Sequence, residues 1–147
     1  IAAGGIMDGA GITAAILLGA SAAQLGTAFI DCPESSADAN HRAALHSDAA
    51  RFTTMTRVIS GRTARCIPNR FMSLVGEVPV GQIPSYPLAY DAAKSLAVAA
   101  RGAGESGYSI KLAGQGAPLA RAIPAGDFVQ LLHREMEHAL QRQELVV

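Results

Sequence analysis

The stretch that decides the fold is residues 1–30, IAAGGIMDGAGITAAILLGASAAQLGTAFI. Residues 1–4 form an apolar run that does not alternate with polar residues, and residues 21–25 form a second segment of strand length. Such runs are typical of strands in a parallel sheet, which are covered on both faces. Between them, residues 10–18 have helical spacing, and Gly19 suits the position just after a helix end. The sequence therefore predicts a βαβ unit of an α/β fold.

Small residues follow both expected strands. Gly4 and Gly5 come after the first strand, and Gly26 and Thr27 come after the second. Since the carboxyl ends of neighbouring parallel strands share one edge, where ligands bind in these folds, the glycines should lie together. Accessible backbone N–H groups suit a phosphate, and Gln24 shares the side of its strand with Gly26. The alternative is that the glycines only permit tight turns and close packing.

Composition excludes several classes of partner. The chain has 147 residues, half of them apolar, with a net charge of zero and no Trp. Neither nucleic acid nor an anionic membrane surface is expected as a partner. The longest apolar run, residues 12–25, is too short and too interrupted to span a bilayer. No signal peptide is expected, and Cys32 and Cys66 are interpreted as free thiols, so we expect a cytoplasmic protein.

The rest of the chain is mixed and mostly helical. Sequence patterns predict a helix capped by Ser35 and ending near residue 46, a β-hairpin, and further helices joined by Gly- and Pro-rich loops. The hairpin strands are 52–59 and 62–67; the later segments are a short helix at 69–75, a loop at 76–84, a helix from Pro87 to about 101, a break at 102–107, an extended piece at 108–116 and a last helix at 125–142. The expected buried stripe of the last helix is Phe128, Leu131, Leu132, Met136, Ala139 and Leu140.

Two tyrosines and a lysine share one helical face. Tyr86, Tyr90 and Lys94 are spaced four and four, so their side chains should project in one direction. Two phenols and an ammonium in a row could line a pocket for an anionic substrate. The alternative is an amphipathic helix whose tyrosines cover the core while the lysine is solvated, and the spacing alone favours that alternative.

Three arginines, Arg62, Arg65 and Arg70, lie near the second strand of the expected hairpin. The alternation in residues 62–67 does not place Arg62 and Arg65 on the same face. A joint anion clamp is therefore not expected, and structural salt bridges are the favoured interpretation.

The sequence contains no convincing acid, base, nucleophile or metal site. His41 and His46 are five residues apart, as are His133 and His138, which places each pair about 140° apart on a helix. Because that geometry is poor for chelation, all four are expected at the surface. There is no nucleophile elbow, no Walker A motif and no pair of catalytic carboxylates. If the protein is an enzyme, a cofactor carries the chemistry or the reacting groups lie outside this chain.

Several separated motifs carry a resemblance to a known family. Residues 1–30, SGRTARCIPNRF (60–71) and LAGQGAPLARAIPA (112–125) resemble the C-terminal part of nitronate monooxygenases, formerly called 2-nitropropane dioxygenases, of the bacterial class I group. The resemblance covers nearly the whole chain. It implies the C-terminal part of an FMN-binding (β/α)8 TIM barrel with an appended, mostly α-helical substrate domain.

The resemblance also implies site residues. Tyr86, Tyr90 and Lys94 match active-site residues of the class I enzymes, which now favours pocket lining over the amphipathic alternative. No histidine here matches the family's histidine near the flavin, so the catalytic His is expected outside this chain. No metal is expected. The expected FMN-binding residues are Gly4, Gly5, Gln24, Leu25 (through its backbone), Gly26 and Thr27.

The implied organisation has three parts. Residues 1–50 form the last two β/α units of the barrel, residues 51–125 the substrate domain, and residues 126–147 a helix packing back on the barrel. The family's chain is about twice as long, so the N-terminal half of the same protein is the expected partner. Why the sequence begins at Ile1 is left open.

The implied function is oxidation of alkyl nitronates, such as propionate 3-nitronate, with O2 to a carbonyl compound and nitrite. One alternative keeps the fold and makes the protein an NAD(P)H-dependent quinone or enoyl reductase. Another is a noncatalytic fragment that needs its N-terminal half, because two barrel strands alone expose unsatisfied sheet edges.

Overall fold

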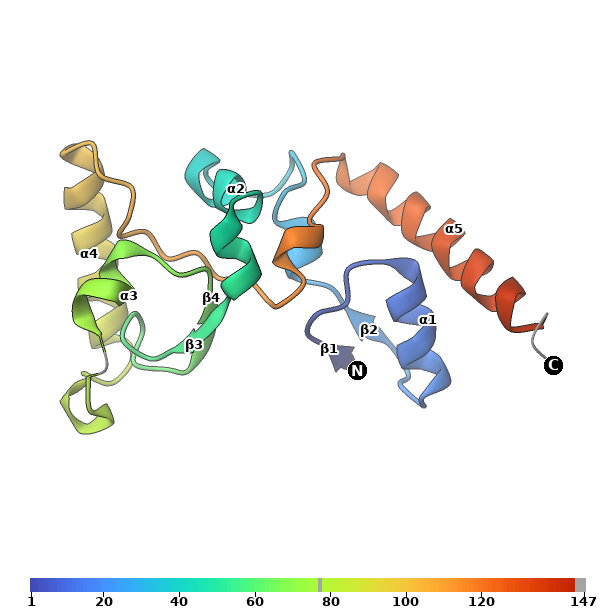
Figure 1. The fold of residues 1–147 in the computed structure, drawn as a ribbon, viewed down its shortest axis with the longest axis horizontal. Coiled ribbons are helices and arrows are strands. Elements are labelled where there is room, and N and C mark those ends of the chain that lie inside the picture. The colour runs from blue at the N-terminus through green and yellow to red at the C-terminus, as the bar shows by residue number, and fades with distance from the viewer. Residues whose placement is uncertain (77, 145–147) are drawn as a thin grey trace.

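The computed structural model describes residues 1–76 and 78–144, and Figure 1 shows an elongated molecule. One end holds the first strands and the first and last helices, and the other end holds a hairpin and two further helices (Figure 1). The α-helices are α1 (Gly9–Leu17), α2 (Ala39–Leu45), α3 (Arg70–Val75), α4 (Leu88–Gly102) and α5 (Ala125–Glu144). The strands are β1 (Ala2–Ala3), β2 (Ala23–Gln24), β3 (Thr54–Thr56) and β4 (Ala64–Cys66).

The predicted βαβ unit is present. β1 and β2 are parallel, with Ala2 opposite Ala23, although each strand is only two residues long. The N-terminus of α1 is capped by Asp8, whose carboxylate accepts the N–H of Gly11 at 2.7 Å. After α1, Gly19 has φ +101°, which is the left-handed conformation expected just beyond a helix end.

Helix α5 packs along α1 (Figure 1). Close approach requires a glycine, because a Cβ at Gly9 would lie 2.3 Å from the Leu132 carbonyl oxygen. The prediction for the buried stripe of α5 is wrong at Leu140, which is 47% exposed. The core between these elements contains Met7, Ala28, Cys32, Phe128 and Leu132.

The second helix begins later than expected. Its N-cap is Asp38, whose carboxylate accepts the N–H of His41 at 2.8 Å, and not Ser35. The hydroxyl of Ser35 instead accepts the N–H of Ala37, which forms a turn. The Arg42 guanidinium also donates to carbonyl oxygens of the preceding segment, including that of Ser35 at 2.8 Å, which holds this segment outside the helix.

The hairpin is shorter than predicted. β3 and β4 pair antiparallel, with Met55 opposite Arg65, over three residues each. Phe52 belongs to a 3₁₀ helix at Asp48–Phe52, and the Gly61 N–H donates to the Arg57 carbonyl oxygen, so the chain leaves the ladder early. The expected loop at 76–84 contains a 3₁₀ turn at Val80–Gln82, and residue 77 lies outside the described residues.

The faces of the β1–β2 pair are not covered on both sides by the described residues. Ile1 is 87% exposed, and Ala3 is also exposed. At the end of α1, Leu17 and the C-cap residue Leu18 expose apolar side chains to solvent. The expectation of strands buried on both faces is therefore not met within the described part of this chain. Separately, no described helix is long and apolar enough to cross a membrane.

Candidate functional site

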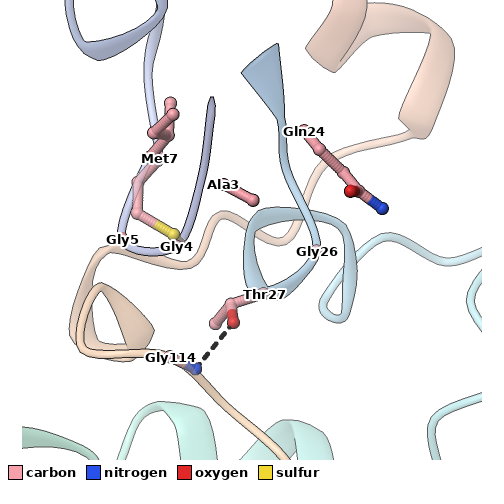
Figure 2. A pocket seen from close by; sticks show the side chains of 9 residues that line it. Ala3, Gly4, Gly5, Met7, Gln24, Gly26, Thr27 and Gly114 are labelled. Atoms are coloured by element: carbon pink, nitrogen blue, oxygen red, sulfur yellow. Dashed lines mark hydrogen bonds between the residues drawn. The ribbon is translucent and has the colours of Figure 1, made fainter. Parts of the chain in front are cut away.

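A cavity of about 300 Å³ opens at the carboxyl edge of β1 and β2, where the sequence predicted a ligand (Figure 2). Most of its lining comes from the two strand ends, and one residue comes from a distant loop. The lining residues are Ala3, Gly4, Gly5, Ile6, Met7, Gln24, Gly26, Thr27 and Gly114. Five of the six predicted cofactor-binding residues are thus brought together. The sixth, Leu25, packs its side chain on the core instead.

The backbone at this edge is open and offers donors. Gly4 and Gly5 have φ +98° and +73°, a conformation that side-chain-bearing residues rarely adopt. A Cβ added at Gly4, Gly5 or Gly26 would meet nothing within 4 Å, so these glycines are not there for close packing. Within the described residues, the N–H groups of Gly5, Gly26 and Thr27 donate to no protein acceptor. The edge can therefore receive an acceptor-rich group.

A loop far along the chain completes the cavity. The hydroxyl of Thr27 accepts the N–H of Gly114 at 2.8 Å (Figure 2) and keeps its own proton available to donate. A Cβ at Gly116 would lie 2.3 Å from Cγ of Met7, so this glycine is needed for close approach. The motif at residues 112–125 gives no role for its glycines from sequence alone. The local signal for a close approach is the pair Gly114 and Gly116, two residues apart.

The N-terminus of α1 is already occupied by carboxylates. Gly9 donates its N–H to Glu135 of α5 at 2.8 Å, and Gly11 donates to Asp8. Glu135 is also paired with Arg121 at 2.6 Å. Since the first donors of α1 have acidic partners, an incoming anion would be held by the strand-end loops and not by this helix.

A second cavity, of about 220 Å³, lies beside the hairpin and the start of α4. Tyr86, which immediately precedes the N-cap of α4, and Tyr90 both line it, with ring centroids 5.9 Å apart. The two tyrosine rings therefore lie together as predicted, although Tyr86 precedes the helix and not all three residues belong to one helical face. The other lining residues are Thr56, Ile59, Ser60, Arg62, Ala64, Cys66, Ile110 and Leu112.

Lys94 extends the same row but does not line this cavity. Its ammonium lies 4.5 Å from the ring centroid of Tyr90 and 3.0 Å from a carboxylate oxygen of Asp91. The hydrogen bond to Asp91 raises the pKa of Lys94, so the side chain stays cationic at neutral pH. The three predicted substrate residues are adjacent, with the lysine at the end of the row.

A third, more open cavity of about 680 Å³ shares Tyr90, Ile110 and Leu112 with the second. It is also lined by Asp38 and Arg101, whose charged groups are 3.7 Å apart, and by His41. Burial lowers the pKa of His41, whose Nε2 lies 3.1 Å from the Leu112 carbonyl oxygen. A neutral imidazole that donates to this carbonyl fits both observations.

Two histidines hydrogen-bond to other segments of the chain, and both cysteines are buried. His41 and His46 were expected at the surface, and both are partly exposed, but each also joins distant parts of the chain. Nε2 of His46 lies 2.6 Å from the carboxylate of the buried Asp31. Both cysteines are free and buried. Burial raises the pKa of Cys66 to about 11 and also raises that of Cys32, so neither thiol suits nucleophilic chemistry.

Comparison with known proteins gives one consistent family. A family model described as nitronate monooxygenase matches residues 1–135. The nitronate monooxygenase of Paraburkholderia phytofirmans is 52% identical over 142 residues, which are 97% of this chain and 39% of that protein. The nitronate monooxygenase of Pseudomonas aeruginosa is 49% identical over 92% of this chain and 39% of its own length. The chain thus spans 39% of the length of these curated relatives.

Solved structures agree with the sequence comparison. A nitroalkane oxidase from Streptomyces ansochromogenes matches with a TM-score of 0.86 and 39% identity, over 96% of this chain and 40% of that one. FabK from Thermotoga maritima matches with a TM-score of 0.75 and 25% identity, over 99% of this chain and 46% of that one.

Proposed function

The chain belongs to the nitronate monooxygenase family, and from this premise we propose that it is part of an FMN-dependent enzyme that oxidises alkyl nitronates. The proposed substrates are small nitronates such as propionate 3-nitronate, which are converted with O2 to a carbonyl compound and nitrite. The glycine-lined cavity at the β1–β2 edge carries the proposal. Because the chain spans 39% of its relatives, the remaining barrel strands and the catalytic histidine are proposed to come from the N-terminal half of the same protein.

The strand-end residues fit the phosphate of FMN. Three backbone N–H groups without protein acceptors among the described residues and one hydroxyl proton offer donors to a dianion. The open space over the glycines leaves room for the group. When bound, FMN would supply the electron transfer from the substrate anion. The residues proposed to hold it are Gly4, Gly5, Gln24, Leu25, Gly26 and Thr27.

The residues around the second cavity are proposed to hold the nitronate. The hydroxyl groups of Tyr86 and Tyr90 would donate hydrogen bonds to nitronate oxygens, and Lys94 would contribute positive charge from the end of the row. The ring spacing of 5.9 Å and the ammonium 4.5 Å from Tyr90 support this arrangement. These groups bind and orient the anion, which brings it into a fixed position for electron transfer.

The proposed organisation follows the same division. Residues 1–50 would complete the TIM barrel, residues 51–125 would form the substrate domain, and residues 126–147 would return to the barrel. The packing of α5 on α1 supports the last point, and residues 145–147 lie outside the described residues. The two free, buried cysteines support a cytoplasmic enzyme.

The test uses the purified full-length protein loaded with FMN. Addition of propionate 3-nitronate in air should consume O2 and release nitrite, and NADH added without O2 should leave the flavin colour unchanged. Rapid bleaching of the flavin by NADH, without nitronate turnover, would overturn the proposal in favour of the NAD(P)H-dependent quinone or enoyl reductase.

A further inference from the structure

Among the described residues that line the cavity beside the two tyrosines, Arg62 is the cationic one. Lys94 is not in the lining and already has a carboxylate partner, Asp91, at 3.0 Å. An anion that enters this cavity therefore meets the Arg62 guanidinium directly, whereas Lys94 acts across the ring of Tyr90. The alternation of residues 62–67 favours a structural salt bridge for Arg62.

Arg62 differs from its two neighbours in what it contacts. Arg70 forms an ion pair with Glu105, and Arg65 donates to the Thr53 carbonyl oxygen at 2.8 Å. Within the described residues Arg62 has no carboxylate partner, and its Cζ lies 4.3 Å from the ring centroid of Tyr86. A guanidinium held by an aromatic ring keeps its N–H donors available for a ligand. The expected salt bridge is absent for Arg62 among these residues.

The backbone holds Arg62 in this position. Gly61 has φ +78°, and a Cβ there would lie 2.5 Å from the Pro84 carbonyl oxygen and 2.7 Å from the backbone nitrogen of Tyr86. The hairpin turn thus lies directly against the segment that leads into α4. That contact places the Arg62 guanidinium beside the Tyr86 ring.

The apolar lining residues of this cavity determine which group attached to the anion fits inside it. Ile59, Cys66 and Ile110 supply apolar surface, and Ile59 and Cys66 are almost fully buried. A cavity of about 220 Å³ accommodates a short alkyl chain. Nitronate and carboxylate groups are both planar with two oxygens, the shape that a guanidinium fork binds through two hydrogen bonds.

We propose that Arg62 is a specificity residue that binds a planar, two-oxygen anionic group on a short apolar chain. A role of Arg62 in nitronate turnover rests on the proposed function. Its role in binding an anion does not. Butyrate carries the same group and chain class and undergoes no oxidation, so its affinity tests Arg62 even if the protein oxidises no nitronate.

The experiment measures the Kd of butyrate by titration calorimetry on the full-length, FMN-loaded protein. We expect Arg62→Gln to raise this Kd at least tenfold and Arg62→Lys to raise it less, because lysine keeps the charge but loses the fork. The matched control is Arg57→Gln, which removes a nearby exposed arginine outside the cavity lining and should change the Kd less than twofold.

Kinetics then show which anionic group Arg62 holds. A rise in KM for both propionate 3-nitronate and propyl-1-nitronate in Arg62→Gln assigns the nitronate, and a rise for the first substrate alone assigns the carboxylate. If the wild-type protein does not oxidise nitronates but binds butyrate in an Arg62-dependent way, the proposed function is rejected and this inference stands. Equal butyrate affinity in the wild type and a folded Arg62→Gln variant would overturn it.

Discussion

At Gly116 the chain has no room for a side chain, since a Cβ would lie 2.3 Å from Cγ of Met7. We expect Gly116→Ala to lower the free energy of unfolding by about 1–3 kcal/mol, the usual cost of overpacking a core. Urea denaturation of the full-length protein measures it. The control is Gly126→Ala in α5, where an added Cβ meets nothing within 4 Å. Equal stability of the two variants would contradict the close packing of this loop.

His41 makes stability depend on pH. Burial lowers its pKa in the folded state below the ordinary value of 6.5, so the unfolded chain binds a proton more readily. The neutral imidazole's contribution is complete above about pH 6.5 and is lost as the pH falls through the folded-state pKa. Urea titrations at pH 7 and 5 should show the wild type losing more stability than His41→Gln, which keeps a donor for the Leu112 carbonyl. Parallel losses in both proteins would exclude this role.

At the scale of elements, one carboxylate joins α1 to α5. Glu135 accepts the Gly9 N–H at 2.8 Å and pairs with Arg121 at 2.6 Å. Replacing it by alanine should cost about 1–3 kcal/mol of stability, because both partly buried donors lose their charged acceptor. Thermal or urea unfolding measures the loss.

The control for Glu135 is on the same helix. Glu137 lies on the exposed face, 3.3 Å from His133, and Glu137→Ala should change stability by less than about 0.5 kcal/mol. A Glu137→Ala variant as unstable as Glu135→Ala would contradict a specific link from Glu135 to α1, since alanine favours a helix and helix propensity cannot explain a loss.

Local sequence patterns predicted which helices and strands are present better than where they begin and end. The βαβ unit, α4 and α5 follow from periodicity, and Gly19 correctly indicated the end of α1. The start of α2 was misplaced although a local signal exists, because Asp38 is a favoured N-cap residue three positions before His41. Arg42 also holds carbonyl oxygens of the preceding segment outside the helix. The hairpin ended early for a similar reason, since Gly61 lies against the segment before α4.

The candidate site was predictable where it rests on strand ends. Gly5, Gly26 and Thr27 follow from parallel topology, since strand ends meet at one edge. Gly114 could not be placed, because nothing local brings a residue 87 positions away onto Thr27. The contact of Arg62 with the Tyr86 ring could not be predicted, because alternation shows which face of a strand a side chain is on and not which distant side chain it meets.

At the scale of the whole molecule, the exposed apolar surface predicts poor behaviour of this chain alone. Ile1 is 87% and Leu18 90% exposed, and the outer edges of the two-stranded sheet are unpaired within the described residues. We expect the isolated 147-residue chain to self-associate and to bind no FMN. Size-exclusion chromatography with a visible spectrum measures both. A yellow, monomeric preparation would contradict the proposed need for the rest of the barrel.

The central claim is that the β1–β2 edge holds the phosphate of FMN, and the ratio of FMN to riboflavin affinity tests it most directly. In the full-length apoprotein, flavin fluorescence should give a Kd for FMN at least a hundredfold below that for riboflavin. Gly26→Ala places a methyl group in open space at the edge without a contact closer than 4 Å, so the fold should persist. We expect Gly26→Ala to reduce the affinity for FMN relative to riboflavin about tenfold or more while the riboflavin Kd stays constant. An unchanged ratio of the two affinities would contradict a phosphate site at this edge.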